Sequence, residues 1–129
     1  RHNELLLTAD TTVIKGEKIL GQPSNRAEAM AMLAELSGRK HQVISGVYLR
    51  TINKTVSVHV KTDVIFEELE EQEIQHYLDD YKPYDKAGAY GIQEWIGMIG
   101  IKSIVGDYYN VVGLPLNKLY QTLKREFQV

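Results

Sequence analysis

The chain has 129 residues, of which 43% are hydrophobic and 25% are charged, and this composition is typical of one soluble domain with its own core. Its net charge of −2 offers no basic face for nucleic acid, and no apolar run reaches the length of a membrane-spanning helix. The absence of cysteine excludes disulfides and thiolate zinc sites. These counts favour a domain that binds neither nucleic acid nor membrane.

The start of the chain predicts a strand followed by a hairpin. Residues 5–9 form a short apolar run that ends at Asp10, a pattern typical of a buried strand. Apolar pairs at 13–14 and 19–20 flank residues 15–18, which contain a glycine, and this arrangement favours a β-hairpin.

A helix is expected next. Ser24 or Asn25 is its predicted N-cap, because Asn25 and Glu28 have the spacing of a capping box. Residues 37–38, Ser-Gly, are expected to end the helix, since glycine suits the left-handed closing position. The packed stripe is predicted to contain Ala27, Met30, Ala31 and Ala34, with Leu33 at its edge.

The middle of the chain predicts two strands and a second helix. Residues 41–52 are rich in β-branched and aromatic side chains on both faces, as in a central strand, and 53–54 is a plausible turn. Residues 55–66 alternate with period two, the strongest strand signal of the chain. Residues 70–80 predict an amphipathic helix whose apolar face holds Ile74, Tyr77 and Leu78.

The last third predicts a loop, a strand and a final helix. Residues 85–93 and 95–100 are interpreted as loop that leads into a strand over 98–105. Pro115 is expected in the first turn of the last helix, which shows helical spacing of Leu116, Leu119, Tyr120, Leu123 and Phe127. Strands and helices in this order argue for an α/β or α+β fold, with a mixed β-sheet flanked by helices.

Four segments are unusual for a structural framework. Residues 85–93, Asp-Lys-Ala-Gly-Ala-Tyr-Gly-Ile-Gln, place a lysine and an amide among glycines, which allows backbone to approach a ligand closely. The others are residues 7–13, 36–43 and 106–115. In this order the four segments resemble the Maf family of nucleoside triphosphate pyrophosphatases. The resemblance is carried by Asp10, Thr11, Gln93 and the glycines around them.

The resemblance implies a fold and an activity. The fold is the mixed α/β one shared with inosine triphosphate pyrophosphatases, in which the site lies in a cleft between two lobes. The activity is hydrolysis of a nucleoside triphosphate to its monophosphate and pyrophosphate, with a divalent cation, Mg²⁺ or Mn²⁺, as cofactor. Family members are generally cytoplasmic and often homodimeric, and they have been linked to inhibition of septum formation.

The resemblance also implies a segment that residues 1–129 do not contain. The family has a preceding Ser-x-x-Arg-Arg type motif that holds the triphosphate, and nothing here matches it. The chain starts at Arg1 and reaches strand-like sequence almost at once. We therefore expect a single Maf-like domain that lacks the N-terminal segment of the family.

Asp10 is the predicted catalytic residue. A carboxylate at a strand end can reach a ligand, and it can act as a general base or hold a divalent cation. The local sequence alone favours a structural reading, in which Asp10 caps a turn with Thr12. In the Maf family this aspartate is the proposed base, so the resemblance favours catalysis, with metal binding as a possible second role.

Thr11 and Gln93 are the predicted specificity residues. An amide both donates and accepts, so Gln93 could read a pyrimidine edge, although a surface glutamine is the ordinary interpretation. Thr11 could contact a base or a phosphate, although threonine is common in strands. In the family, residue types at these two positions separate the branches, and Asp-Thr with Gly-Ile-Gln resembles the branch that acts on dTTP and UTP.

Lys86 and Gln22 are predicted phosphate contacts. Lys86 is a cation in a glycine-rich loop, and the alternative is a solvated lysine paired with Asp85. Gln22 stands where the family usually has a lysine, within Leu20-Gly21-Gln22-Pro23. An amide brings no positive charge, so Gln22 is expected to bind phosphate more weakly.

Several other polar residues are assigned structural roles. The four histidines lack paired metal-ligand spacing and are treated as ordinary. Asn110 is expected to fix a turn in a loop before the final helix, and Trp95 to pack.

Two rival functions stay open. One is the same chemistry on 7-methyl-GTP or a modified nucleotide. The other is a weakly catalytic nucleotide-binding regulator of septum formation and cell division, an idea that Gln22 supports.

Overall fold

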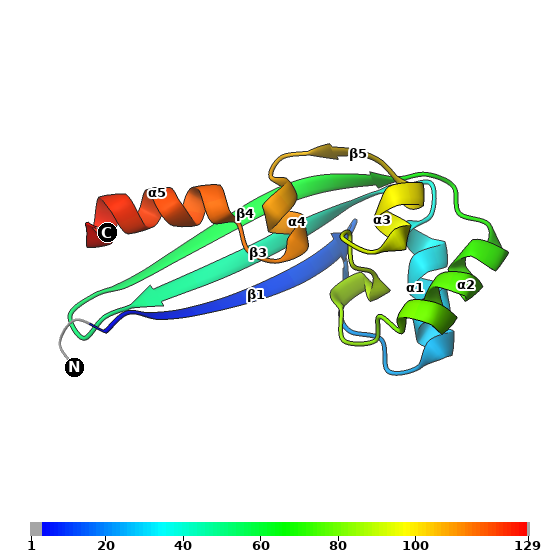
Figure 1. Ribbon diagram of the computed structural model, residues 1–129, viewed down its shortest axis with the longest axis horizontal. Helices are drawn as coiled ribbons and strands as arrows, with labels where there is room; N and C mark the ends of the chain where they lie inside the picture. The colour runs from blue at the N-terminus through cyan, green and yellow to red at the C-terminus, as the bar shows by residue number, and fades with distance from the viewer. Residues whose placement is uncertain (1–3, 129) are drawn as a thin grey trace.

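The computed structural model describes residues 4–128, which form a long twisted sheet with helices gathered mainly at one end (Figure 1). The strands are β1 (Leu6–Lys15), β2 (Lys18–Leu20), β3 (Lys40–Arg50), β4 (Thr55–Phe66) and β5 (Ile101–Val105). The helices are α1 (Arg26–Leu36), α2 (Glu71–Tyr81), the short 3₁₀ turn η1 (Ala87–Ala89), α3 (Trp95–Gly100), α4 (Tyr108–Val112) and α5 (Leu116–Phe127).

The five strands lie in the order β2-β1-β3-β4-β5. The combination of one sheet with flanking helices confirms the predicted fold class. Among the described strands every neighbouring pair is antiparallel rather than of mixed direction. The β1–β2 and β3–β4 connections explain part of this pairing, because a connection of a few residues can only join antiparallel neighbours.

The first strand differs from its prediction in length and in burial. β1 runs on through Lys15, so Asp10 lies inside the strand rather than at its end. Leu6 and Leu7 are 61% and 43% exposed, so the expectation of a buried strand is wrong at this end. Within the described chain, residues 6–12 of β1 pair only with β3, because β2 covers only residues 13–15.

The hairpin and the ends of α1 are as predicted. Lys15 pairs with Lys18 across a two-residue turn, and Gly16 supplies the positive φ of 62° that this turn needs. Asn25 caps α1 by accepting a hydrogen bond from the backbone N–H of Glu28. Gly38 follows the helix with a φ of 68°.

The predicted face of α1 is wrong at its three alanines, whereas Leu33 is buried as predicted and Met30 packs against the core. The residues that the helix buries are Ala29, Leu33 and Leu36, whereas Ala27, Ala31 and Ala34 are exposed and Met30 is half-buried. Most positions of this helix are apolar all the way round, so the spacing of apolar residues does not single out one face. The packing of α1 against the sheet and α2 decides which face is buried.

The middle of the chain follows its prediction. β3 pairs with β1 on one side and β4 on the other, as expected of a central strand. Thr51 and Lys54 exchange backbone hydrogen bonds around the predicted 53–54 turn. The buried side chains of α2 are Ile74, Tyr77 and Leu78, the three that its amphipathic pattern predicts.

The last third departs most from its prediction. Residues 95–100 form helix α3 rather than loop, and the following strand begins at Ile101 rather than at residue 98. The glycines that suggest a loop allow close packing, since a side chain at Gly97 would collide with the carbonyl group of Ile92. Trp95 packs as expected, edge-on against His76.

A short helix also replaces part of the loop predicted before the final helix. Helix α4 begins after Asp107, whose carboxylate accepts a hydrogen bond from the backbone N–H of Tyr109. Pro115 then stands directly before α5. Of the spaced apolar residues of α5, Leu119 is buried and Leu116 is 45% exposed, so the helix covers the sheet with one narrow face.

The core is divided between the two ends of the molecule. The larger cluster lies under α1, α2 and α3 and includes Leu33, Val43, Phe66 and Tyr77. A small second cluster lies under α5 and consists of Val47, Leu49 and Leu119, with half-buried Leu114, Leu123 and Phe127 around it. None of the helices in the described part of the chain is long and apolar enough to span a membrane.

Candidate active site

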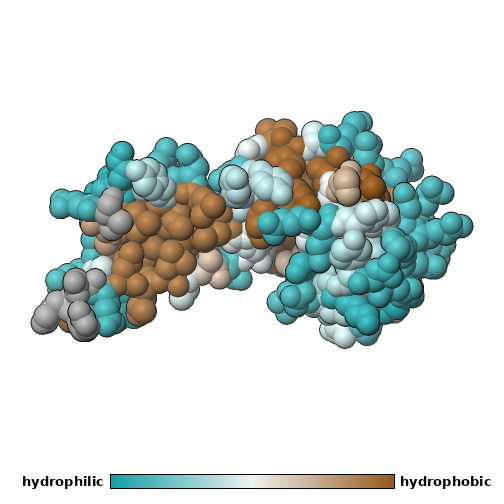
Figure 2. All heavy atoms as spheres, viewed as in Figure 1, coloured by the Kyte–Doolittle hydropathy of each residue, from teal (hydrophilic) through white to brown (hydrophobic). Residues whose placement is uncertain are grey.

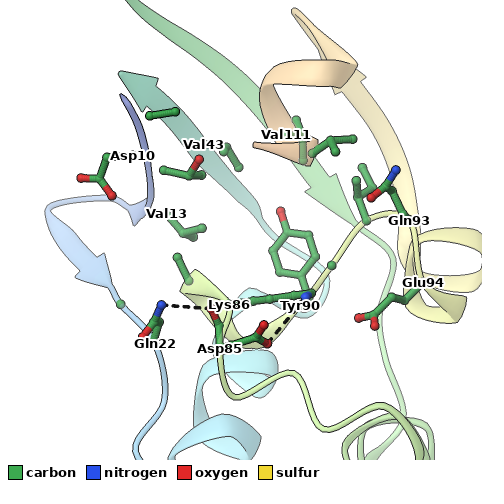
Figure 3. A pocket seen from close by; sticks show the side chains of 17 residues that line it. Asp10, Val13, Gln22, Val43, Asp85, Lys86, Tyr90, Gln93, Glu94 and Val111 are labelled. Atoms are coloured by element: carbon green, nitrogen blue, oxygen red, sulfur yellow. Dashed lines mark hydrogen bonds and ion pairs between the residues drawn. The ribbon is translucent and has the colours of Figure 1, made fainter. Parts of the chain in front are cut away.

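All five residues predicted as site residues line one cavity of about 790 Å³ (Figure 3). They are Asp10, Thr11, Gln22, Lys86 and Gln93. They come from three separate stretches of chain: β1, the segment after β2, and the glycine-rich segment 85–93. Helix α4 adds Val111 and Val112 to the wall. Residues far apart in sequence therefore meet in one place, as a binding site requires.

Glycines bring the 85–93 segment against the sheet. Gly88 adopts a φ of 73°, and a Cβ at this position would lie 3.2 Å from the side chain of Val13 on β1. The backbone N–H of Gly88 donates to the carbonyl oxygen of Gly21 at 3.1 Å. The glycine-rich segment is therefore held close to the hairpin, and Val13, Gly21 and Ala87 around this contact line the cavity.

Lys86 lies in the cavity wall and also pairs with Asp85. Its Nζ is 3.6 Å from Asp85 Oδ1, which is the pairing considered as the alternative to phosphate binding. A Cβ at Gly91 would lie 2.7 Å from Cε of Lys86. The lysine stem therefore occupies space that only a glycine at position 91 leaves free. Asp85 is largely exposed, so the pairing leaves the ammonium group accessible.

Gln22 is tied to the same loop. Its Nε2 donates to the carbonyl oxygen of Asp85 at 3.0 Å, so the amide nitrogen joins the segment after β2 to the 85–93 segment. This bond uses one N–H of the Gln22 amide and leaves the second, which can donate to a phosphate oxygen but cannot neutralise its charge.

Glu94 also lines the cavity, and sequence reasoning missed it. Its Oε1 accepts a hydrogen bond of 2.6 Å from the hydroxyl of Tyr77, and this hydroxyl accepts one from the N–H of Gly91. Burial and the bond to Glu94 raise the pKa of Tyr77, which therefore stays a neutral donor. The signal was available, because a tyrosine on the apolar face of a helix needs a partner for its hydroxyl.

Asp10 stands at the rim. Figure 3 places its carboxylate on the opposite side of the cavity from Gln93 and Glu94. The side chain is exposed, since it belongs to the part of β1 that pairs only with β3 among the described residues. Asp10 is thus positioned to meet solvent and a bound ligand together.

The ionisable groups in the cavity wall are mainly acidic. Asp10, Asp85 and Glu94 carry three negative charges, and Lys86 carries one positive charge. The oxygen donors of carboxylates and amides suit Mg²⁺ or Mn²⁺. Within residues 4–128 no three histidine, aspartate or glutamate side chains lie close enough together to hold a metal ion. The donor set therefore fits a cation that keeps waters and ligand oxygens in most of its coordination positions, as Mg²⁺ usually does.

Asn110 does not fix a turn as predicted; its side chain fastens α4 to the sheet. The residue is fully buried, and its amide nitrogen lies 3.1 Å from the carbonyl oxygen of Val43, 2.9 Å from that of Val60 and 2.8 Å from Thr62 Oγ1. The backbone oxygen of Asn110 accepts a bond from Ser45, whose hydroxyl lies 2.9 Å from Thr11 Oγ1. A polar network thus connects α4 to a residue of the cavity.

Tyr90 in the cavity wall is hydrogen-bonded to the buried His41 behind it. The Tyr90 hydroxyl lies 2.6 Å from Nε2 of His41. Burial lowers the pKa of His41 to about 4, so this histidine is neutral at physiological pH.

An antiparallel sheet flanked by helices, with a polar cavity between β1 and a glycine-rich loop, defines an α-and-β protein with one candidate small-molecule site among the described residues. The sequence profile of the Maf-like protein family matches residues 1–126, and the chain belongs to this family.

Several curated relatives of the chain carry the same name. A "dTTP/UTP pyrophosphatase" of Parabacteroides distasonis is 57% identical over 122 residues, which cover 95% of this chain and 63% of the relative. Proteins of the same name from Bacteroides thetaiotaomicron and Christiangramia forsetii are 54% and 49% identical, over 95% and 96% of this chain and 63% of each relative. The chain thus spans less than two thirds of the length of these relatives.

Proposed function

We propose that the protein hydrolyses dTTP and UTP to the monophosphate and pyrophosphate. The observation that carries this proposal is the meeting of Asp10, Thr11, Gln22, Lys86 and Gln93 in one cavity. The relatives named dTTP/UTP pyrophosphatase support the choice of nucleotide.

Asp10 is the proposed general base. It accepts a proton from a water molecule, whose oxygen then forms a bond to the α-phosphorus. The bond between this phosphorus and the bridging oxygen to the β-phosphate breaks, and pyrophosphate leaves. The exposed position of Asp10 at the rim gives such a water access from solvent.

Lys86 is the proposed phosphate contact. Thr11 and Gln93 are the proposed contacts of the nucleobase. Because the ionisable groups of the wall are mainly acidic, a bound Mg²⁺ or Mn²⁺ would neutralise phosphate oxygens, with Asp10 as one protein ligand. Gln22 can only add a hydrogen bond. The N-terminal segment of the family is the proposed source of further positive charge.

The finer assignments rest on the family resemblance alone. We infer that residues 1–129 belong to a single Maf-like domain. A cytoplasmic homodimer is the proposed form of the protein.

Two alternatives keep some support. The same chemistry on 7-methyl-GTP or a modified nucleotide would use the same cavity. A weakly catalytic nucleotide-binding regulator of septum formation is favoured by Gln22, because its amide is already bonded to Asp85 and brings no charge.

The test is pyrophosphate release by the full-length protein from dTTP, UTP, CTP and 7-methyl-GTP, with Mg²⁺ or Mn²⁺. Release from dTTP and UTP that falls at least about 100-fold in Asp10→Asn is the expected result. Asp80→Asn, an exposed change on α2 outside the cavity, is the matched control. Binding of these nucleotides without release would support the regulator, and Gln22→Lys would then be the informative reversion.

A further inference from the structure

We propose that Ser45 and Asn110 hold the Thr11 hydroxyl as a hydrogen-bond acceptor toward the cavity. The site then selects a ligand that donates at this point, such as the imide N–H of uracil or thymine, over the unprotonated ring nitrogen of cytosine. This inference rests on the proposed function, because it assumes that a nucleobase lies beside Thr11.

Thr11 and Ser45 lie opposite each other on neighbouring strands. Thr11 on β1 is the register partner of Ser45 on β3, and their hydroxyl oxygens lie 2.9 Å apart. Ser45 is fully buried, whereas Thr11 is half-buried and lines the cavity. Ser45 therefore cannot exchange its partners for water, and the network begins from a fixed point.

The direction of the bonds follows from counting protons. Ser45 donates its only hydroxyl proton to the carbonyl oxygen of Asn110 at 3.1 Å, since a carbonyl can only accept. Thr11 is then the donor in the contact with Ser45. Its other neighbour is the carbonyl oxygen of Gly113, at 3.4 Å, which also can only accept. In each arrangement the Thr11 proton stays inside the protein, and a lone pair remains for a ligand.

Asn110 keeps this arrangement in place. Its side-chain nitrogen is bonded to acceptors on both β3 and β4. The backbone carbonyl oxygen of Asn110, which accepts the bond from Ser45, is therefore held in place. The N–H of Gly113 also donates to that carbonyl oxygen at 3.1 Å. Gly113 has a φ of 132°, which a side chain would strain, so the turn after α4 is fixed as well.

A ligand that accepts from Thr11 is disfavoured by this network. If Thr11 donates outward, either its bond to Ser45 breaks, or Ser45 turns its proton to Thr11 and loses its bond to Asn110, so one internal hydrogen bond is lost in both cases. A ligand that donates to Thr11 adds a bond without breaking one. One net hydrogen bond corresponds to a preference of about threefold to tenfold.

Gln93 does not supply this discrimination. Its amide both donates and accepts, and its side chain is exposed, so it can turn to match either base. The Thr11 hydroxyl donates its proton to another protein group, so it can only accept from a ligand. Thr11 is therefore the residue that distinguishes a donor from an acceptor on the nucleobase. Ser45 and Asn110 are thus positioning residues that act through Thr11.

The experiment compares kcat/KM for UTP and CTP in the full-length protein and in four variants, one of them a control. In Ser45→Ala, Thr11 keeps only the long 3.4 Å contact with the carbonyl oxygen of Gly113, so its proton can turn to a ligand. The preference for UTP over CTP should then fall about threefold to tenfold while kcat on UTP changes little. Thr11→Val should lose the preference, and Thr11→Ser should retain it. Ser57→Ala, an exposed serine on β4 outside the cavity, is the matched control and should keep the wild-type ratio.

A substrate pair tests the same point without a mutation. N3-methyl-UTP lacks the imide proton and should be a poor substrate, whereas 5-methyl-UTP carries its methyl group elsewhere and should behave like UTP. Dissociation constants for UMP and CMP, measured in parallel, give a readout that does not require turnover.

The outcomes separate the two proposals. A wild-type protein that hydrolyses no nucleotide overturns the proposed function, and the UMP and CMP affinities then decide the inference. A wild-type preference for UTP that Ser45→Ala leaves unchanged overturns the inference alone. Equal binding of UMP and CMP, or binding of neither, also overturns it.

Discussion

The two ends of the sheet are stabilised in different ways. At one end α1, α2 and α3 enclose a core of fully buried side chains, including Leu33 and Tyr77. At the other end α5 alone covers the sheet, where its buried Leu119 clusters with Val47 and Leu49 of β3. On the face that Figure 2 shows, the end with α1 and α2 is mostly hydrophilic, whereas the strands beside α5 present a broad hydrophobic area.

The cavity lies toward the helix-covered end, where loops can be held by a well-packed core. The 85–93 segment is anchored by Val13 and Tyr77, which both belong to the larger core. The α5 end contributes no residue to the cavity wall. Precise positioning of the site therefore depends on one end, and changes at the two ends should have different consequences.

The largest expected effect is on the larger core. Leu33→Ala removes a fully buried side chain of α1 from the larger core and should lower the free energy of unfolding by about 2–5 kcal/mol. Leu119→Ala on α5 should lower the free energy of unfolding by about 2 kcal/mol, near the lower limit of this range. The reason is that the smaller cluster around Leu119 has more room to collapse into the space left by the side chain. Denaturant unfolding of both variants measures this difference. Equal losses would contradict the contrast between the two ends.

Acid should destabilise the helix-covered end through His41. The pKa of His41 is lowered to about 4 by burial, whereas the unfolded chain has the ordinary value near 6.5. The contribution of neutral His41 to the free energy of unfolding is therefore fully present above pH 6.5. It is lost as the pH falls toward 4, and the loss is on the order of 3 kcal/mol.

Unfolding measured from pH 7 to 4 in wild type and His41→Phe tests this expectation. The variant should lose much of the slope in this window, although other groups contribute to both proteins. The same slope in both would show that His41 is not the titrating group responsible.

Tyr77→Phe should have a moderate effect that reaches the cavity. It removes only the hydroxyl, so Glu94 and the N–H of Gly91 each lose a partner, and the expected cost is about 1 kcal/mol. Because Glu94 is then free to turn, KM for the nucleotide should change more than it does in Tyr81→Phe. Tyr81 stacks on Tyr77 from the same helix, is 40% exposed, and serves as the control.

The smallest effect is expected near α5. Lys54 lies 2.9 Å from Glu126, and both side chains are partly exposed. Such a pair is screened by salt and contributes little, so Lys54→Met should leave Tm indistinguishable from wild type at physiological ionic strength. A clear fall in Tm would show that the α5 end depends on this contact.

Part of the fold could be predicted because its signals are local. The period-two pattern of 55–66, the amphipathic face of α2 and the glycine turn at Gly16 each follow from residues a few positions apart. The predicted site residues were named from short motifs and a family resemblance. The structure brings them to one cavity, and their roles remain proposals.

The rest depended on contacts between distant residues. The buried face of α1 could not be predicted, because an apolar helix packs according to what covers it. Helix α3 forms where Gly97 packs against Ile92, although its glycines suggest a loop. The end of β1 could not be placed either, because pairing with β3 extends the strand through Asp10.

The sequence by itself determined which chemical groups the protein carries: Asp10, Thr11 and Gln93 in a Maf-like order, and the strands and helices with strong periodicity. Only the tertiary structure decided how these groups are held. The Glu94–Tyr77 bond and the network from Thr11 through Ser45 to Asn110 join residues far apart in the chain. Hydrogen-bond partners of buried groups depend on which strands and helices meet, and no local pattern encodes that.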